Sequence, residues 1–66
     1  MNTEQYKDSR GLYNMTKEQV EGADYNDLYS ICCYCNYQGG WTAETKNWVT
    51  KEIARRQRAL IERSQG

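Results

Sequence analysis

A short segment ahead of the first long helical stretch carries the side chains best suited to binding. This segment contains Tyr13, Asn14, Thr16 and Lys17. These residues supply a ring for stacking, an amide, a hydroxyl and an ammonium group beside the N–H groups that begin a helix. The combination favours a phosphorylated ligand that carries a base. Tyr6 and Arg10 would join the site if the N-terminal segment folds over it.

A basic stripe in the second half of the chain offers a further set of anion contacts. Lys51, Arg55 and Arg58 are spaced at i, i+4 and i+7, which places them on one outward helical face. A solvated face is the alternative interpretation, and an Arg58–Glu62 pair at i, i+4 would support it. The stripe alone leaves both interpretations open.

The cysteine cluster Cys32-Cys33-Tyr34-Cys35 contains a C-x-x-C spacing. The chain has no histidine and no second cysteine pair, so only a dimer could supply four soft zinc ligands. A redox cysteine belongs at an exposed helix N-terminus, whereas these cysteines fall deep inside a helix. We therefore predict that they pack as small apolar side chains, with no metal, no cofactor and no intramolecular disulfide.

Catalysis is disfavoured by the same inventory of side chains. The sequence has no glycine-rich phosphate loop and no serine or cysteine beside a plausible base. Glu18 and Glu21 are close in sequence, but they belong to a solvated helix start. We predict that the protein is not an enzyme.

Length and composition favour one small domain that associates with itself. The chain has 66 residues, of which 38% are hydrophobic, and a chain this short buries little apolar surface alone. It carries no secretory leader pattern and no apolar run long enough to span a membrane, so we expect a cytoplasmic protein. Disulfides and metals being disfavoured, a homo-oligomer is the expected source of further stability.

The charges divide unevenly along the chain. Residues 1–45 carry three basic and seven acidic side chains, whereas residues 46–66 carry six basic and two acidic ones. Attraction between the two halves explains this division, and so does an anion site on the basic half. The overall charge is zero, which disfavours binding to duplex nucleic acid.

Two helix starts and a glycine pair predict an all-α antiparallel helical hairpin. Thr16 and Thr42 read as N-caps, and Gly39-Gly40 can adopt the positive φ that ends a helix. We predict helices over about 17–37 and 43–63. The single domain, 1–66, then divides into an N-terminal arm at 1–15, in which 3–10 forms a short helix, a first helical segment at 16–38, a turn at 39–41, a second helical segment at 42–63 and a tail at 64–66.

The chain reverses at Gly39-Gly40, and both helices advance by the same distance per residue. The predicted register therefore pairs residues whose numbers add up to about eighty. The apolar stripes are Val20, Leu28, Ile31 and Cys35 on the first helix, and Thr45, Val49, Ile53 and Leu60 on the second. Asp24 and Arg56 interrupt these stripes opposite each other. We predict that they form a cross-hairpin ion pair, with independent exposure to solvent as the alternative.

Several aromatic residues remain outside the core of a single predicted hairpin. Trp41 and Trp48 fall on one flank of the second helix, and Tyr29 turns away from the core of the first. Aromatic rings with a polar group suit an interface between chains. We expect Trp41, Trp48 and Tyr29 to lie at an oligomer interface.

The layout resembles small phage proteins that counter CBASS and Thoeris immunity by sequestering nucleotide signals. The similarity rests on Tyr13, on the run from Thr16 to Glu21, on Trp41, on Thr50-Lys51 and on Arg58-Ala59-Leu60. Members of that family have a short N-terminal arm and a helical hairpin, and many assemble into compact oligomers. The resemblance implies that Tyr13, Thr16, Lys17, Lys51 and Arg58 contact the ligand.

The resulting hypothesis is a viral, anti-defence protein that binds a cyclic di- or trinucleotide and holds it without chemistry. Stacking on aromatic rings and contacts from Arg and Lys to phosphate would hold the ligand. One alternative is a phage-type inhibitor that binds and blocks a host protein with its aromatic and basic face. A second alternative is a structural or nucleic-acid-associated helical protein.

Overall fold

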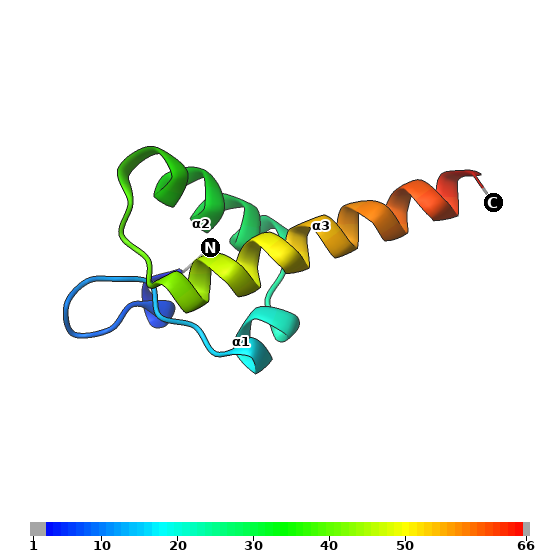
Figure 1. The fold of residues 1–66 in the computed structure, drawn as a ribbon. Coiled ribbons are helices and arrows are strands. Elements are labelled where there is room, and N and C mark those ends of the chain that lie inside the picture. Colours follow the sequence, from blue (N-terminus) through cyan, green and yellow to red (C-terminus); the bar gives the residue numbers. More distant parts are fainter. Residues whose placement is uncertain (1–2, 66) are drawn as a thin grey trace.

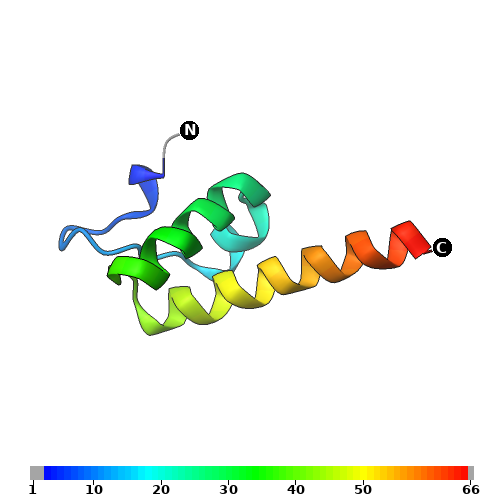
Figure 2. The same cartoon turned by 90° about the horizontal axis from the view of Figure 1, so that it is seen from above.

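A computed structural model describes residues 3–65, and this part of the chain is all-α. It contains a short 3-10 helix, η1 (Glu4–Tyr6), and three α-helices, α1 (Lys17–Gly22), α2 (Tyr25–Gln38) and α3 (Ala43–Gln65). Figures 1 and 2 show α1 and α2 packed against the first half of α3, whose second half projects away from them. The predicted all-α class is confirmed. Residues 1, 2 and 66 of the predicted arm and tail lie outside the described residues.

The first predicted helix, 17–37, is wrong as a single element, because it breaks at Ala23 and Asp24. Both residues have extended backbone, with ψ of 152° and 147°, so the chain changes direction between α1 and α2. Asp24 therefore stands at the N-cap position of α2, where a short polar residue is favourable. Gly22, the last residue of α1, lowers the helical preference just before this break.

Both predicted helix starts are confirmed by their capping contacts. The Thr16 hydroxyl accepts a hydrogen bond from the Gln19 N–H, and the Gln19 side chain accepts one from the Thr16 N–H. At the second start, the Thr42 hydroxyl accepts from the Thr45 N–H at 3.2 Å. These contacts satisfy N–H groups that would otherwise lack partners in the first helical turns.

The turn between α2 and α3 has the predicted backbone geometry. Gly39 and Gly40 have φ of 75° and 100°, a region that side chains rarely allow. The N-terminal segment is joined to this turn through Tyr13, whose N–H donates to the Gly40 carbonyl at 2.8 Å. The Tyr13 carbonyl in turn accepts from the Thr42 N–H at 3.1 Å. These bonds fix the segment that leads into α1.

The predicted short helix over 3–10 is reduced to η1. Asp8 ends it by forming a tight turn, in which its carboxylate accepts from the N–H groups of Arg10 and Leu12. The Arg10 side chain also pairs with Asp8, at 2.8 Å. An acidic side chain that bonds its own following backbone favours a turn over a helix.

One core joins all these elements. Its fully buried side chains are Leu28, Ile31, Val20, Val49 and Thr45. The buried Thr45 hydroxyl accepts from the Met15 N–H at 2.8 Å, so the core contains a satisfied polar group. Trp41 and Trp48 are half-buried and pack against this core. The expectation that one chain leaves these two rings uncovered is therefore corrected.

The second half of α3 extends past the packed region. The chain changes direction at Ala23, so α1 does not continue the line of α2. Only α2, with 14 residues, therefore runs along α3, which has 23. The described chain is accordingly elongated, with extents of 44 × 23 × 22 Å. Leu60, predicted as core, is 58% exposed, and the predicted tail is helical up to Gln65. No helix within residues 3–65 combines the length and apolarity needed to cross a membrane.

Candidate functional site

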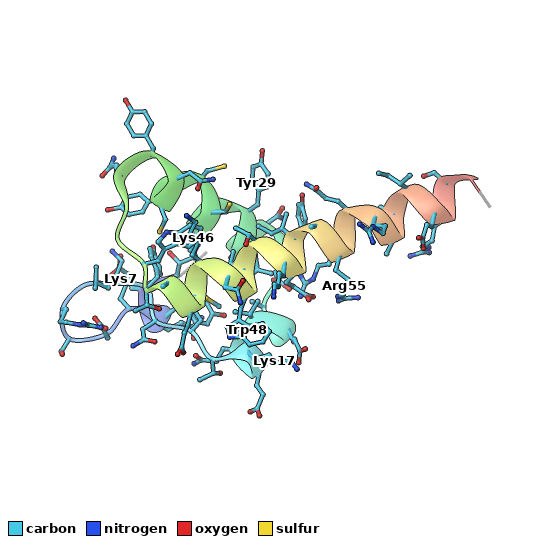
Figure 3. All side chains as sticks on the ribbon, in the orientation of Figure 1. Lys7, Lys17, Tyr29, Lys46, Trp48 and Arg55 are labelled. Carbon is cyan, nitrogen blue, oxygen red and sulfur yellow. The ribbon has the colours of Figure 1, made fainter. Side chains whose placement is uncertain are left out.

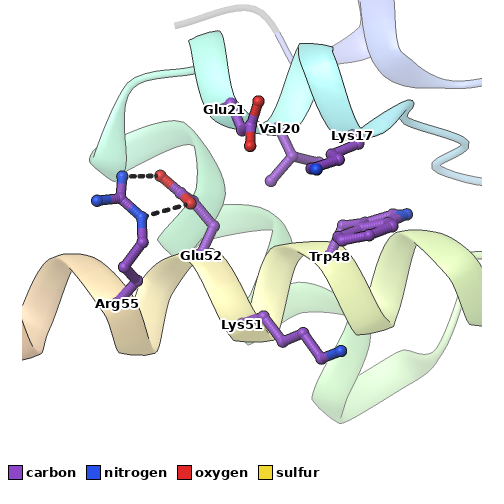
Figure 4. Close-up of a pocket in the computed structure, with 7 residues that line it drawn as sticks. All are labelled: Lys17, Val20, Glu21, Trp48, Lys51, Glu52 and Arg55. Carbon is purple, nitrogen blue, oxygen red and sulfur yellow. Dashed lines mark hydrogen bonds and ion pairs between the residues drawn. The ribbon is translucent and has the colours of Figure 1, made fainter.

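A small cavity between α1 and α3 is lined by basic side chains and one indole ring. We call it the Trp48 pocket, and its volume is about 110 Å³. Its lining comprises Lys17, Val20, Glu21, Trp48, Lys51, Glu52 and Arg55 (Figure 4). Figure 3 places Lys17 and Trp48 on the same side of the molecule, below α3 in that view. Val20 is fully buried and forms the apolar floor.

Helix periodicity on α3 positions most of this lining. Trp48, Lys51, Glu52 and Arg55 are spaced at i, i+3, i+4 and i+7, so they share one face of the helix. Lys17 comes from the opposite side as the first residue of α1. The capping box at Thr16 fixes where α1 begins and therefore where Lys17 lies.

Two ammonium groups from different helices converge on the Trp48 ring. Lys17 Nζ lies 5.5 Å from the ring centroid, and Lys51 Nζ lies 5.8 Å from it. An ammonium group at this distance from an indole face is attracted by the ring electrons. Each contact holds an exposed cation against the ring, so either lysine can meet an anion that approaches Trp48.

A carboxylate organises the inner end of the pocket. Glu52 is 8% exposed and accepts from Arg55 Nε at 3.0 Å and from Arg55 Nη2 at 2.6 Å. Arg56 Nε donates to the same carboxylate at 2.7 Å. The hydrogen bonds from Arg55, opposed by burial and reinforced by Arg56, lower the pKa of Glu52 to about 2. Glu52 therefore stays ionised and holds both guanidinium groups in place.

The predicted ion pair between Asp24 and Arg56 does not form. Arg56 instead pairs with Glu52 and donates to the backbone carbonyl of Glu21 at 3.1 Å. Asp24 is exposed at the start of α2. An uninterrupted helix would have turned Asp24 toward Arg56, but the break at Ala23 removes it from that helix face. The predicted register is kept near Tyr25, whose hydroxyl accepts from Gln57 Nε2 at 2.9 Å.

Acid is expected to weaken the fold partly through Glu52. Its pKa of about 2 lies below the ordinary 4.5, so its stabilising effect is complete above about pH 4.5 and is lost as the pH falls toward 2. Wild type should therefore melt well above Glu52→Gln at neutral pH, and the two melting temperatures should converge near pH 2. Asp8, whose pKa is also about 2, is present in both proteins and cancels from the difference. If the two melting temperatures stay equally far apart over this pH range, Glu52 does not stabilise the fold through its ionised carboxylate.

The structure separates the sequence-predicted ligand residues into two groups. Lys17 and Lys51 meet in the Trp48 pocket. Tyr13 does not, because it is only 6% exposed and its hydroxyl is hydrogen-bonded to Thr3 Oγ1 at 3.0 Å. Its ring contacts Tyr34 edge to face. Tyr13 is thus a core residue, and the predicted stacking of a base on it is corrected.

The other predicted contacts are engaged elsewhere or lie apart. Asn14 Nδ2 is 3.4 Å from Asp8 Oδ2, and the Thr16 hydroxyl is used by the helix cap. Arg58 is exposed on α3 and is not part of the pocket lining. Tyr6 packs against the core. The N-terminal segment therefore supplies scaffold contacts, and only Lys17 reaches the pocket.

Tyr29 and the cysteines lie on α2, away from the Trp48 pocket. Tyr29 is 51% exposed and stacks on Tyr25. Cys35 is buried, Cys32 is partly buried and Cys33 is exposed, and all three are free thiols. Burial raises the pKa of Cys32 and of Cys35, which keeps these two thiols protonated and poorly reactive. Residues 3–65 contain no group of three or more His, Cys, Asp or Glu side chains that could hold a metal ion.

Sequence reasoning missed the roles of Trp48 and Glu52 in the site, whereas Arg55 belongs to the predicted basic stripe. The i, i+3, i+4, i+7 spacing from Trp48 to Arg55 was the available signal, because it places a ring, two cations and an acid on one helical face. Assigning Trp48 to an oligomer interface obscured that signal. Comparison of the chain with protein-family models, with curated proteins and with solved structures finds no match.

Proposed function

We propose that this protein binds a nucleotide-class ligand at the Trp48 pocket and holds it without chemical change. The convergence of Lys17 and Lys51 on the Trp48 ring carries the proposal. Ammonium groups bind phosphate, and an indole face binds a base by stacking, so the pocket offers both halves of nucleotide recognition. The pocket lining contains no histidine, serine or cysteine that could attack such a ligand.

The size of the pocket determines how such a ligand would lie. A cavity of about 110 Å³ accepts a phosphate group but not a whole nucleotide. We place the phosphate against the lysine ammonium groups and the base on the Trp48 ring, where it takes the position that an ammonium group holds in the free protein. Arg55, two-thirds exposed, extends the positive lining beyond Lys51. Binding of this kind gives about 1–3 kcal/mol for each stacked base and a similar amount for each charged phosphate contact.

A cyclic di- or trinucleotide is the ligand that we propose, acting as an immune signal that a phage-type anti-defence protein removes. The resemblance to nucleotide-sequestering phage proteins supports this choice. A ligand with several phosphates and bases also suits several pockets in one assembly, so we propose that the helical hairpin works as a homo-oligomer. Joining sites in this way raises affinity without requiring a deeper pocket.

Fluorescence of Trp48 tests the proposed site. Trp41→Phe leaves Trp48 as the single indole, and a stacked base should quench its emission in a saturable way. A cyclic dinucleotide should quench, whereas inorganic phosphate at equal concentration should not, because it carries no base. Saturable quenching that disappears in Lys51→Gln would support the site. Equal responses with Lys51→Gln and with the parent protein would contradict it.

A further inference from the structure

The projecting half of α3 exposes an apolar face next to a hollow. Beyond Arg56 this α3 extension, residues 57–65, presents Leu60 and Ile61, which are 58% and 57% exposed. A cavity of about 280 Å³ lies at its base, lined by Tyr25, Arg55, Arg56, Ala59, Leu60 and Arg63. Figure 1 shows that no other element of residues 3–65 covers the tip of this helix. Leu60 is therefore both exposed and part of the lining of this hollow.

Opposite charges flank this surface at its two ends. The α3 extension carries Arg58 and Arg63 against Glu62. The α1–α2 corner, which we define as residues 18–27, carries Glu18, Glu21, Asp24 and Asp27 and has no basic residue. This corner adjoins the base of the extension, as the contacts from Arg56 to the Glu21 carbonyl and from Gln57 to the Tyr25 hydroxyl show. One molecule thus has an acidic corner at the base of the α3 extension and a basic tip at its end, separated by about two to three helical turns.

We propose that the α3 extension binds a second copy of this chain in antiparallel orientation. A two-fold arrangement centred near Ala59 brings the basic tip of each copy to the acidic corner of the other. Arg63 then lies opposite position 55 of the second copy, next to the acidic corner of that copy, which contains the exposed Asp24. Arg55 at that position is paired with Glu52, a carboxylate that it shares with Arg56, so the acidic corner supplies the further negative charge that Arg63 meets.

The same arrangement explains the residue types along the extension. Ala59 at the crossing point lets the two helices approach closely, because its side chain is small. Leu60 of each copy enters the hollow beside Tyr25 and Arg56 of the other, which removes apolar surface from water. The contact is self-complementary, so a closed dimer forms and no open filament grows. This inference rests on the homo-oligomer part of the proposed function and names its surface.

The molar mass of a Leu60 variant in solution tests whether this surface forms the dimer. Light scattering at about 100 µM should give a dimer for wild type and a monomer for Leu60→Asp, with the dissociation constant of the dimer raised at least about tenfold. Tyr37→Asp is the matched control, because Tyr37 is 89% exposed and lies at the far end of α2. This control should remain dimeric. Circular dichroism of each variant should show an unchanged fold, since Leu60 and Tyr37 lie outside the core.

A charge exchange tests the antiparallel orientation. Arg63→Glu should weaken the dimer, and adding Asp24→Arg to the same chain should restore it, because each contact then has opposite signs again. A wild-type monomer at this concentration would overturn the inference, as would a dimer that Leu60→Asp leaves intact or a double variant that fails to recover. Nucleotide binding is measured separately by the Trp48 emission. A monomer that still binds nucleotide would therefore end this inference while leaving the pocket in place.

Discussion

Leu28→Ala is expected to remove much or all of the stability of the fold. Leu28 is fully buried between α2 and α3, and truncating such a residue costs about 2–5 kcal/mol. A domain of 66 residues has a total free energy of unfolding of about 3–10 kcal/mol, so this loss removes much or all of it. Chemical denaturation followed by far-ultraviolet circular dichroism measures the change directly.

Tyr37→Ala provides the control for this core substitution. It removes more atoms than Leu28→Ala does, but Tyr37 is 89% exposed, so the expected cost is below about 0.5 kcal/mol. The comparison separates burial from side-chain size. Similar unfolding midpoints for the two variants would contradict the core described for this fold.

Removing both lysines of the Trp48 pocket is expected to have the largest effect on ligand binding. Lys17→Gln with Lys51→Gln keeps most of each side chain and deletes the two charges that converge on Trp48. With a contribution of about 1.5–3 kcal/mol for each charged contact to phosphate, affinity should fall by at least about a hundredfold. Both lysines are exposed, so the variant should keep its fold.

Arg58→Gln is the matched control for charge on the same helix. It also deletes one positive charge from α3, but Arg58 is absent from the pocket lining. Its affinity should stay within about twofold of wild type at moderate salt, because a distant exposed charge is screened. The resemblance to phage proteins predicts instead that Arg58 contacts the ligand. Titration of Arg58→Gln beside Lys51→Gln therefore decides between the sequence-based site and the structural one.

Local sequence signals predicted the elements that depend on local chemistry. The caps at Thr16 and Thr42 and the positive φ at Gly39 and Gly40 follow from residue type alone, and the structure confirms all of them. The apolar spacing likewise identified the core of α2 and of the first half of α3. In each case the determining residues lie within a few positions of one another.

Features that depend on distant contacts were not predicted. Tyr13 looked like an exposed stacking ring, yet its backbone pairs with Gly40 and Thr42, which lie far along the chain. The break at Ala23 did have a local signal in Gly22 and Asp24, but the continuing apolar stripe outweighed it in the prediction. Because the prediction lacked this break, it placed Asp24 opposite Arg56. It also placed Leu60 in the core, since an unbroken first helix would have covered α3 much further along.

Dependence on distant contacts also explains why the predicted binding residues differ from those that line the Trp48 pocket. Lys17 and Lys51 are 34 positions apart in the sequence, and only the return of α1 onto α3 brings them to one ring. The residues predicted beside Lys17 instead serve the cap, the Asp8 turn and the core. A spacing pattern can indicate which residues share a helix face, but it does not show which second helix lies opposite that face.

Calorimetry of the wild-type protein with cyclic di- and trinucleotides tests the central claim most directly. We predict saturable heat with at least one of them, loss of that heat in the Lys17→Gln/Lys51→Gln variant, and recovery of intact ligand by chromatography after the protein is denatured. The absence of heat with every cyclic nucleotide would contradict the account, and cleaved ligand would contradict the claim that it is held without chemistry.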